Sequence, residues 1–161
     1  MLKSGWIHVF WVASVIGVVA LVSNITTETQ LTGQADTWLT VRFTLSKLVN
    51  AGTVWGGLLI LAGWLVRRPL AAALAGIAAG EVALAVHYAL GQVFAVYGYG
   101  AHMWAANWPW FVIALVLGAP LGLLGATARR RDGWGLAARL VVPVGAIVEP
   151  FVTSKFARVG P

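Results

Sequence analysis

The sequence lacks cysteine entirely, and it is poor in charged residues, which make up only 10% of its 161 positions. Without cysteine the chain can hold no disulfide, no thiol nucleophile and no thiolate-bound zinc or iron–sulfur centre. Soluble domains usually carry about 25% charged residues, so this composition excludes an ordinary soluble globular protein. Apolar residues make up 60% of the chain. This surplus predicts a membrane protein with a single domain over 1–161.

Motifs for nucleotide binding and hydrolysis are also missing. The sequence has no Walker loop, no GxGxxG, no HExxH and no GxSxG in a credible context. It has no paired aspartates of the kind that bind a diphosphate and magnesium. His8, His87 and His102 are scattered over three segments without an acid at ligand spacing, which argues against a metal site. We therefore expect no metal and no cofactor.

Five apolar runs are long enough, or nearly so, to cross a membrane as helices. We expect these helices over 5–23, 43–66, 69–91, 107–128 and 135–153. The first could be a cleavable signal peptide, but no small-residue cleavage site follows it, so a retained span is favoured. The fifth run contains Arg139, Pro143, Glu149 and Pro150. It could span the membrane, or it could form a broken or re-entrant helix that protein covers.

Positive charge lies between these runs, and the formal net charge is +6. Lys3, Arg67, Arg68 and residues 129–131 fall on one side of the membrane if the runs alternate in direction. The positive-inside rule makes that side cytoplasmic, so we expect a multi-pass plasma-membrane protein with its N-terminus inside. The loops 24–42 and 92–106 would then lie outside. The charge is explained by topology, so we expect no nucleic-acid partner.

The segments 43–91 and 107–153 resemble each other, with Glu81 aligned on Glu149. The alignment predicts a parallel repeat about an axis along the membrane normal. Chance matching of Ala-, Gly- and Leu-rich sequence is the alternative. Pairs of glycines at four-residue spacing predict close helix packing. These pairs are Gly52 with Gly56, Gly76 with Gly80, and Gly118 with Gly122.

Glu81 is the most informative acid. It follows Pro69 by twelve residues, about 18 Å along a helix, which is near mid-membrane. A carboxylate at that depth costs about 2.5–3.5 kcal/mol on insertion scales, so we expect it to face the bundle interior. The functional interpretation is a proton-handling site. The structural alternative is a buried acid satisfied by Asn50 or Thr53 on the preceding run.

The helix that carries Glu81 has one polar stripe. At about 100° per residue, Tyr88 and Gln92 fall on the same face as Glu81, and His87 falls on another. This stripe predicts a cavity that opens toward the outer side. We expect the cavity between the second, third and fifth runs.

Three further acids are candidates. Glu149 precedes a proline that leaves a backbone carbonyl free, so it could line a polar pocket. Alternatively it lies near the membrane surface and pairs with Lys155 or Arg158. Glu28 and Asp36 lie in the first outer loop. They are reserve candidates for a catalytic acid, with plain surface residues as the alternative.

Nine tryptophans are present, and most fit an aromatic belt at the two membrane surfaces. Trp55, near the centre of its run, is an exception. The outer segment is denser in aromatic residues than a belt requires. It holds Tyr97, Tyr99, Trp104, Trp108, Trp110 and Phe111. Aromatic faces stabilise cations by about 0.5–2 kcal/mol each, so this group could cap a cavity that holds positive charge.

Four segments carry a resemblance. They are 48–55 (LVNAGTVW), 79–88 (AGEVALAVHY), 117–122 (LGAPLG) and 145–149 (GAIVE). Together they resemble a family of small, mostly uncharacterised integral-membrane proteins of high-GC bacteria, over about 13–152. More loosely, the chain resembles the small membrane-bound terpene cyclases of bacterial indole-sesquiterpenoid pathways. That resemblance implies a proton-initiated, metal-independent cyclisation of a prenylated indole.

Our leading expectation is therefore an all-α bundle of about five transmembrane helices that acts as a membrane-bound cyclase. Glu81 would protonate a terminal alkene or epoxide, and Glu149 would orient it, share its proton or quench the cation. The substrate would enter sideways from the lipid. Residues expected to shape its site are Asn50, Trp55, Tyr88, Gln92, Trp108 and Trp110.

Two alternatives remain open at this point. One is a small proton-coupled transporter or channel subunit with Glu81 as its proton site, which a homo-oligomer would favour. The other is a non-catalytic structural subunit that packs through its glycine pairs. Such a subunit would tolerate Glu81→Gln with only a change in stability.

Overall fold

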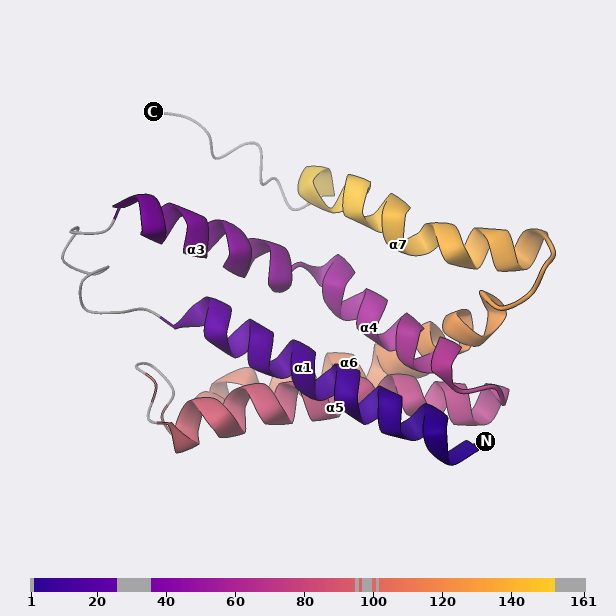
Figure 1. Cartoon of the computed structure of the whole chain (residues 1–161), viewed down its shortest axis with the longest axis horizontal. Coiled ribbons are helices and arrows are strands. Elements are labelled where there is room, and N and C mark those ends of the chain that lie inside the picture. The colour runs from indigo at the N-terminus through magenta and orange to yellow at the C-terminus, as the bar shows by residue number, and fades with distance from the viewer. Residues whose placement is uncertain (1, 26–35, 95, 97–99, 101, 153–161) are drawn as a thin grey trace.

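The computed structural model describes residues 2–25, 36–94, 96, 100 and 102–152. These residues form six α-helices and no strand (Figure 1). The helices are α1 (Leu2–Asn24), α3 (Asp36–Val49), α4 (Gly52–Leu65), α5 (Pro69–Val93), α6 (His102–Thr127) and α7 (Gly133–Val152). The all-α class predicted from composition is confirmed for this part of the chain.

Four of these helices, α1, α5, α6 and α7, are each long and apolar enough to cross a membrane. The pair α3 and α4 passes the same test only jointly, over Leu39–Val49 and Gly52–Leu65, with a bend of 44° at the break. By length and composition the chain therefore has four spans, or five if the bent pair counts as one. This agrees with the prediction of about five spans in a multi-pass membrane protein.

The prediction of one continuous helix over 43–66 is wrong, because α3 ends at Val49 and α4 begins at Gly52. Ala51 between them has extended backbone angles, φ −64° and ψ 139°. The backbone N–H and the side-chain amide of Asn50 both donate to the Ser46 carbonyl, each at 2.9 Å. The segment 50–52 inside this apolar run is therefore a true helix break.

The limits of two other elements differ from prediction. The expected outer loop 24–42 is too long, since α3 already begins at Asp36. The alternative of a broken helix over 135–153 is not found. Instead α7 runs without interruption through Pro143 and Pro150. A membrane helix tolerates proline where neighbouring groups or local adjustments satisfy the freed carbonyl.

The turns between helices gather the positive charge at one end of the bundle. Figure 1 shows the N-terminus, the α4–α5 turn and the α6–α7 turn at the same end. Arg67 and Arg68 lie in the first of these turns, and residues 129–131 lie in the second. We call this the basic end. The break between α3 and α4 lies midway along the bundle.

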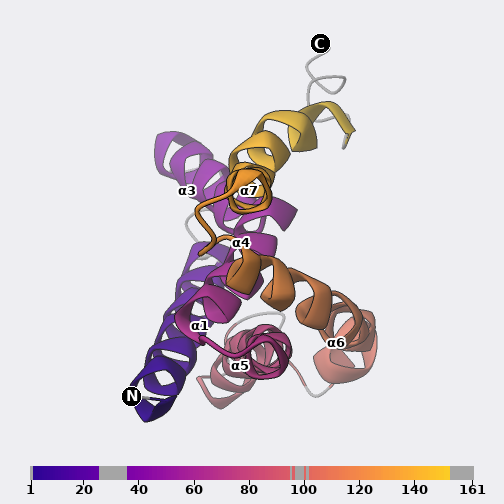
Figure 2. The same ribbon diagram turned by 90° about the vertical axis from the view of Figure 1, so that its right-hand side faces the viewer.

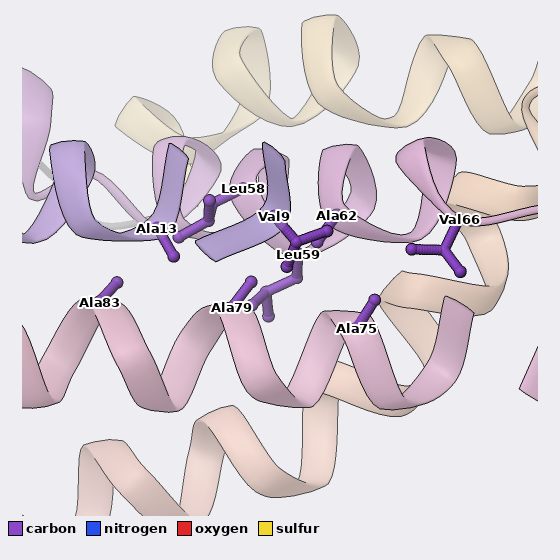
Figure 3. Packing of buried hydrophobic residues seen from close by; sticks show 9 residues of the cluster. All are labelled: Val9, Ala13, Leu58, Leu59, Ala62, Val66, Ala75, Ala79 and Ala83. Atoms are coloured by element: carbon purple, nitrogen blue, oxygen red, sulfur yellow. The ribbon is translucent and has the colours of Figure 1, made fainter. Parts of the chain in front are cut away.

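The centre of the fold is α5, which packs against α1, α4 and α6 (Figure 2). Its contact faces are made of alanine and glycine, so the neighbouring backbones come close to it. The core cluster of this packing is drawn in Figure 3. It comprises Val9, Ala13, Leu58, Leu59, Ala62, Val66, Ala75, Ala79 and Ala83.

Glycine pairs explain the tight contact between α5 and α6. A Cβ atom added at Gly76 would overlap the carbonyl oxygen of Gly118, and one at Gly122 would overlap the backbone of α5. The predicted close approach is therefore found at these positions. It is not found at Gly52 and Gly56, where an added Cβ would meet no atom nearer than 3.8 Å.

The last helix differs from the others in how little of it is buried. Its main contacts with the other described helices are to α4 and α6, and its buried residues are Gly135 and Ala138. The predicted repeat of 43–91 in 107–153 is not confirmed. The first of these segments contains the α3–α4 break, whereas α6 and α7 are both continuous.

Candidate functional site

A cavity of about 410 Å³ lies among α4, α5 and α6. This volume falls in the range of pockets that hold drug-sized ligands, about 300–1,000 Å³. Its lining is largely apolar and aromatic. The lining residues are Asn50, Gly52, Trp55, Gly56, Leu59, Gly80, Leu84, His87, Tyr88, Trp110, Ile113, Ala114, Leu117 and Leu121. The sequence predicted a cavity between the second, third and fifth runs. The third wall is instead the fourth run, α6, because α7 packs on the outside of α4 and α6.

The space exists because one wall lacks side chains. A Cβ added at Gly56 would meet only Leu121 Cδ1, at 3.9 Å. At Gly80 the added atom would meet the Ala114 Cβ at 2.9 Å and the Leu59 Cδ2 at 3.1 Å. Gly80 is therefore a packing glycine, whereas Gly56 borders open space. A larger side chain at Gly56 would fill the cavity rather than separate helices.

The side of the cavity formed by α6 is also the outside of the bundle. Trp110, Ile113 and Leu117 line the cavity and are exposed at the bundle surface. An opening bordered by these apolar side chains would face lipid tails in a membrane. A lipophilic molecule could therefore pass between bilayer and cavity without crossing water.

A cluster of aromatic rings surrounds Tyr88 in the cavity wall. Tyr88 is buried, with its ring 4.8 Å from that of His87 in an edge-on arrangement. It also packs 5.9 Å from Trp104 and 6.0 Å from Phe111, and these two rings stack on each other at 5.8 Å. The ring of Tyr88 is therefore fixed by several neighbours, which makes this a preformed wall.

His87 was expected on a different face from the cavity, and this expectation is wrong. It is buried and lines the cavity together with Gly80 and Leu84. These three residues follow one another at spacings of four and three, so they share one helical face. The imidazole also hydrogen-bonds to the backbone of Gly17 on α1. His87 thus connects the cavity wall to the first helix.

The break between α3 and α4 provides the polar rim of the cavity. The Asn50 side-chain amide donates to Asn24 Oδ1 at 3.1 Å, and the Ser46 hydroxyl donates to the same oxygen at 2.6 Å. Asn50 is therefore anchored to the end of α1. The rim continues with Gly52, the first residue of α4.

Glu149 of α7 binds this new helix start. The backbone N–H groups of Gly52 and Thr53 donate to its carboxyl oxygens at 3.0 and 2.9 Å. The Thr53 hydroxyl donates to it as well. The residue before the helix, Ala51, has no side-chain oxygen to cap it, so Glu149 takes the place of the missing N-cap. An acid is thereby held at the rim of the cavity by three donors.

The predicted acid Glu81 lies elsewhere. It is not among the cavity-lining residues, and its side chain is only half-buried. It directly follows Gly80 and shares a helical stripe with Tyr88, and only these two neighbours line the cavity. No hydrogen bond or ion pair joins it to the part of the chain that the structure describes. The expectation that Glu81 opens onto the cavity is therefore wrong.

The side chains of the other two acids predicted from the sequence lie outside the part of the chain that the structure describes. Glu28 lies outside the described residues. The backbone of Asp36 begins α3, and its side chain also lies outside them. Within the described residues, no group of three or more histidine and acidic side chains could hold a metal ion.

The predicted binding residues fall into two sets. Asn50, Trp55, Tyr88 and Trp110 line the cavity. The other two do not, since the Gln92 side chain accepts a hydrogen bond from Trp104 Nε1 at 2.9 Å and Trp108 is 62% exposed. Trp108 therefore fits the aromatic belt. Residues that sequence reasoning missed include Gly56, Leu59, Leu117 and Leu121.

Comparison of the chain with family models, with curated proteins and with solved structures found no match in any of the three. The resemblance to small bacterial membrane proteins thus stays an expectation from the sequence. Function must therefore be inferred from the cavity itself.

Proposed function

We propose that this protein is a membrane-bound terpene cyclase. A lipophilic prenylated substrate would enter the cavity among α4, α5 and α6 from the bilayer, and it would be cyclised by proton-initiated, metal-independent chemistry. The observation that carries the proposal is the combination of an apolar, aromatic-lined cavity with a carboxyl group at its rim. A farnesylated indole is the substrate class that the sequence resemblance implies.

The reaction requires one proton to enter the substrate and one to leave it. Protonation of a terminal alkene forms a C–H bond and leaves a carbocation. An internal double bond then attacks with its π electrons to form the ring bond, and loss of a proton restores a double bond. The product is an isomer of the substrate, so one carboxyl can serve first as acid and then as base.

We assign this carboxyl to Glu149 rather than to Glu81. The backbone of Gly52, which lines the cavity, hydrogen-bonds to Glu149, whereas Glu81 is not among the lining residues. The rings of Trp55, Tyr88 and Trp110 line the same space and would stabilise the cation while it exists. Glu149 would donate its proton in the protonated form, and the three donors would stabilise the carboxylate that remains and then accepts a proton as the base. In this arrangement Thr53 positions the carboxyl through its hydroxyl.

The test compares two acids in the same assay. Membranes with the wild-type protein are incubated with a farnesylated indole and with its terminal epoxide, and products of unchanged mass and shifted retention are sought by liquid chromatography–mass spectrometry. Glu149→Gln is expected to lower turnover by about 100-fold or more, the usual contribution of a general acid. Glu81→Gln is the matched control and should retain activity. Equal activity in all three proteins would overturn the assignment.

A second candidate is a small proton-coupled transporter. One observation favours it, namely the broken span with an acid at the break, because transporters place substrate and ion sites at the ends of interrupted helices. In this case the proton site would be Glu149. Proton flux in liposomes that Glu149→Gln abolishes, in a protein with no cyclase turnover, would select this candidate.

For either activity we propose a plasma-membrane location with a cytoplasmic N-terminus. The support is the positive charge gathered at the basic end. Since the chain has no cysteine, single cysteines introduced in the α6–α7 turn can be labelled without background. Labelling of that turn from outside intact cells would contradict the orientation.

A further inference from the structure

The lining of the cavity carries no lysine or arginine, and an acid binds its rim. This acid, Glu149, hydrogen-bonds to the rim at Gly52 and Thr53. Arginines are gathered at the basic end. The exception, Arg42, belongs to α3, donates to the Ser23 carbonyl at 3.3 Å and lies over the Phe43 ring. It precedes Asn50 by about 12 Å of helix. Lys47 is closer, in the last turn of α3, but its side chain is exposed and it does not line the cavity.

The lining side chains suit a cation in another way. The electron-rich rings of Trp55, Tyr88 and Trp110 border the cavity. Aromatic faces attract cations most strongly where water is excluded, as it is between apolar walls. His87 is the lining residue that could carry positive charge, and it would oppose a cation only when protonated. Above pH 7.5 an imidazole of ordinary pKa, about 6.5, is neutral.

From this arrangement we infer that the cavity binds stable lipophilic cations, such as quaternary phosphonium or ammonium ions with aromatic or long alkyl groups, in preference to anions of equal size. The inference rests on the proposed role of the cavity as a ligand site. It goes beyond that role by assigning the ligand's charge. It holds for a cyclase, whose intermediate is cationic, and equally for a protein that binds such ions without chemistry.

A matched pair of probes tests the sign of the charge. Tetraphenylphosphonium and tetraphenylborate have nearly the same size and shape and opposite charge. Binding of each to the purified full-length protein in detergent is measured at pH 8 by equilibrium dialysis. Both ions also dissolve in micelles, so only the binding lost in a cavity-filled variant counts as specific.

Gly56→Leu is that variant, because its side chain extends into the cavity from a position where an added Cβ meets only Leu121 Cδ1 at 3.9 Å. The same substitution at Gly133, where nothing lies within 4 Å, is the matched control. We expect Gly56→Leu to weaken phosphonium binding at least tenfold and Gly133→Leu to leave it within twofold. Wild-type binding of the borate should be at least tenfold weaker than that of the phosphonium.

A third comparison tests the source of the preference. Glu149→Gln should weaken phosphonium binding several-fold, whereas Glu81→Gln should not change it. Equal specific binding of both ions, or phosphonium binding that survives Gly56→Leu, would overturn the inference. Cyclase turnover without cation binding would reject the inference and leave the proposed reaction standing. Cation binding without turnover of any prenylated indole would support the inference and reject the proposed reaction.

Discussion

Asp132 and Glu149 each accept hydrogen bonds from the first turn of a helix. Asp132 Oδ1 accepts from the Gly135 N–H at 3.0 Å and caps α7. Glu149 does the same for α4 from a distant helix. Both side chains place negative charge at the positive end of a helix dipole. The two acids thus stabilise the starts of α7 and α4, and only the second of these lies at the cavity rim.

Asp132 gives a prediction about pH. A hydrogen bond from the Arg130 side chain, together with that from the Gly135 N–H, lowers the pKa of Asp132 below its usual value. A lowered pKa means that this carboxylate stabilises the fold above the pKa of the unfolded chain, about 3.9, and that the contribution is lost as pH falls through the folded value. Thermal unfolding should therefore separate wild type from Asp132→Ala at pH 6.

The same two proteins should unfold at more similar temperatures at about pH 2, where the carboxylate is protonated. Asp132→Asn, which keeps an acceptor oxygen but cannot titrate, is the control and should show a smaller pH effect than wild type. A gap between wild type and Asp132→Ala that widens on acidification would contradict the assigned hydrogen bonds.

These two caps also show what can be inferred from sequence alone. Asp132 stands directly before its helix, so the local pattern identifies it as a cap. Glu149 lies 97 residues from Gly52, and no local pattern can pair them. The depth of Glu81 in the membrane could be derived from its distance to Pro69. The direction in which it points depends on where α4 and α6 lie around α5, which the sequence does not specify.

The helices were mostly predictable because their ends are marked by arginines, proline or glycine. Residues 69–91 correspond closely to α5 (Pro69–Val93), with proline at its start. The α3–α4 break was missed because residues 43–66 contain a single charged residue, Lys47, and so resemble one apolar run. The lining faces do show helical spacing, for example Trp110, Ile113 and Leu117. Whether such a stripe lines a cavity can be decided only when the positions of the neighbouring helices are known.

Two glycines should respond oppositely to the same change. In Gly122→Ala the new Cβ would overlap the α5 backbone, so we expect a loss of about 1–3 kcal/mol from overpacking. In Gly145→Ala the nearest atom is a Thr53 methyl at 3.8 Å, and alanine should stabilise α7 by about 0.5–1 kcal/mol. Denaturant unfolding in detergent measures both. Similar stability of the two variants would contradict the described α5–α6 contact.

At the scale of the whole molecule, a packed unit encloses the cavity and a peripheral helix supplies the acid at its rim. The unit formed by α1, α4, α5 and α6 is held by small side chains and encloses the cavity. On its outside, α7 contributes Glu149 at the rim. This division explains why the cavity can keep its shape while the acid that binds its rim comes from a peripheral helix. The composition could predict the membrane bundle but not this division.

The central claim is that this protein binds its ligand in the cavity among α4, α5 and α6. Photolabelling tests it most directly, with a farnesylated indole that carries a diazirine on its terminal isoprene unit, followed by peptide mass spectrometry. We predict labels on cavity residues of α4, α5 or α6, such as Leu59, Leu84 or Leu117, and their loss in Gly56→Leu but not in Gly133→Leu. Labels confined to the exposed faces of α1 or α7, and unchanged by Gly56→Leu, would contradict the claim.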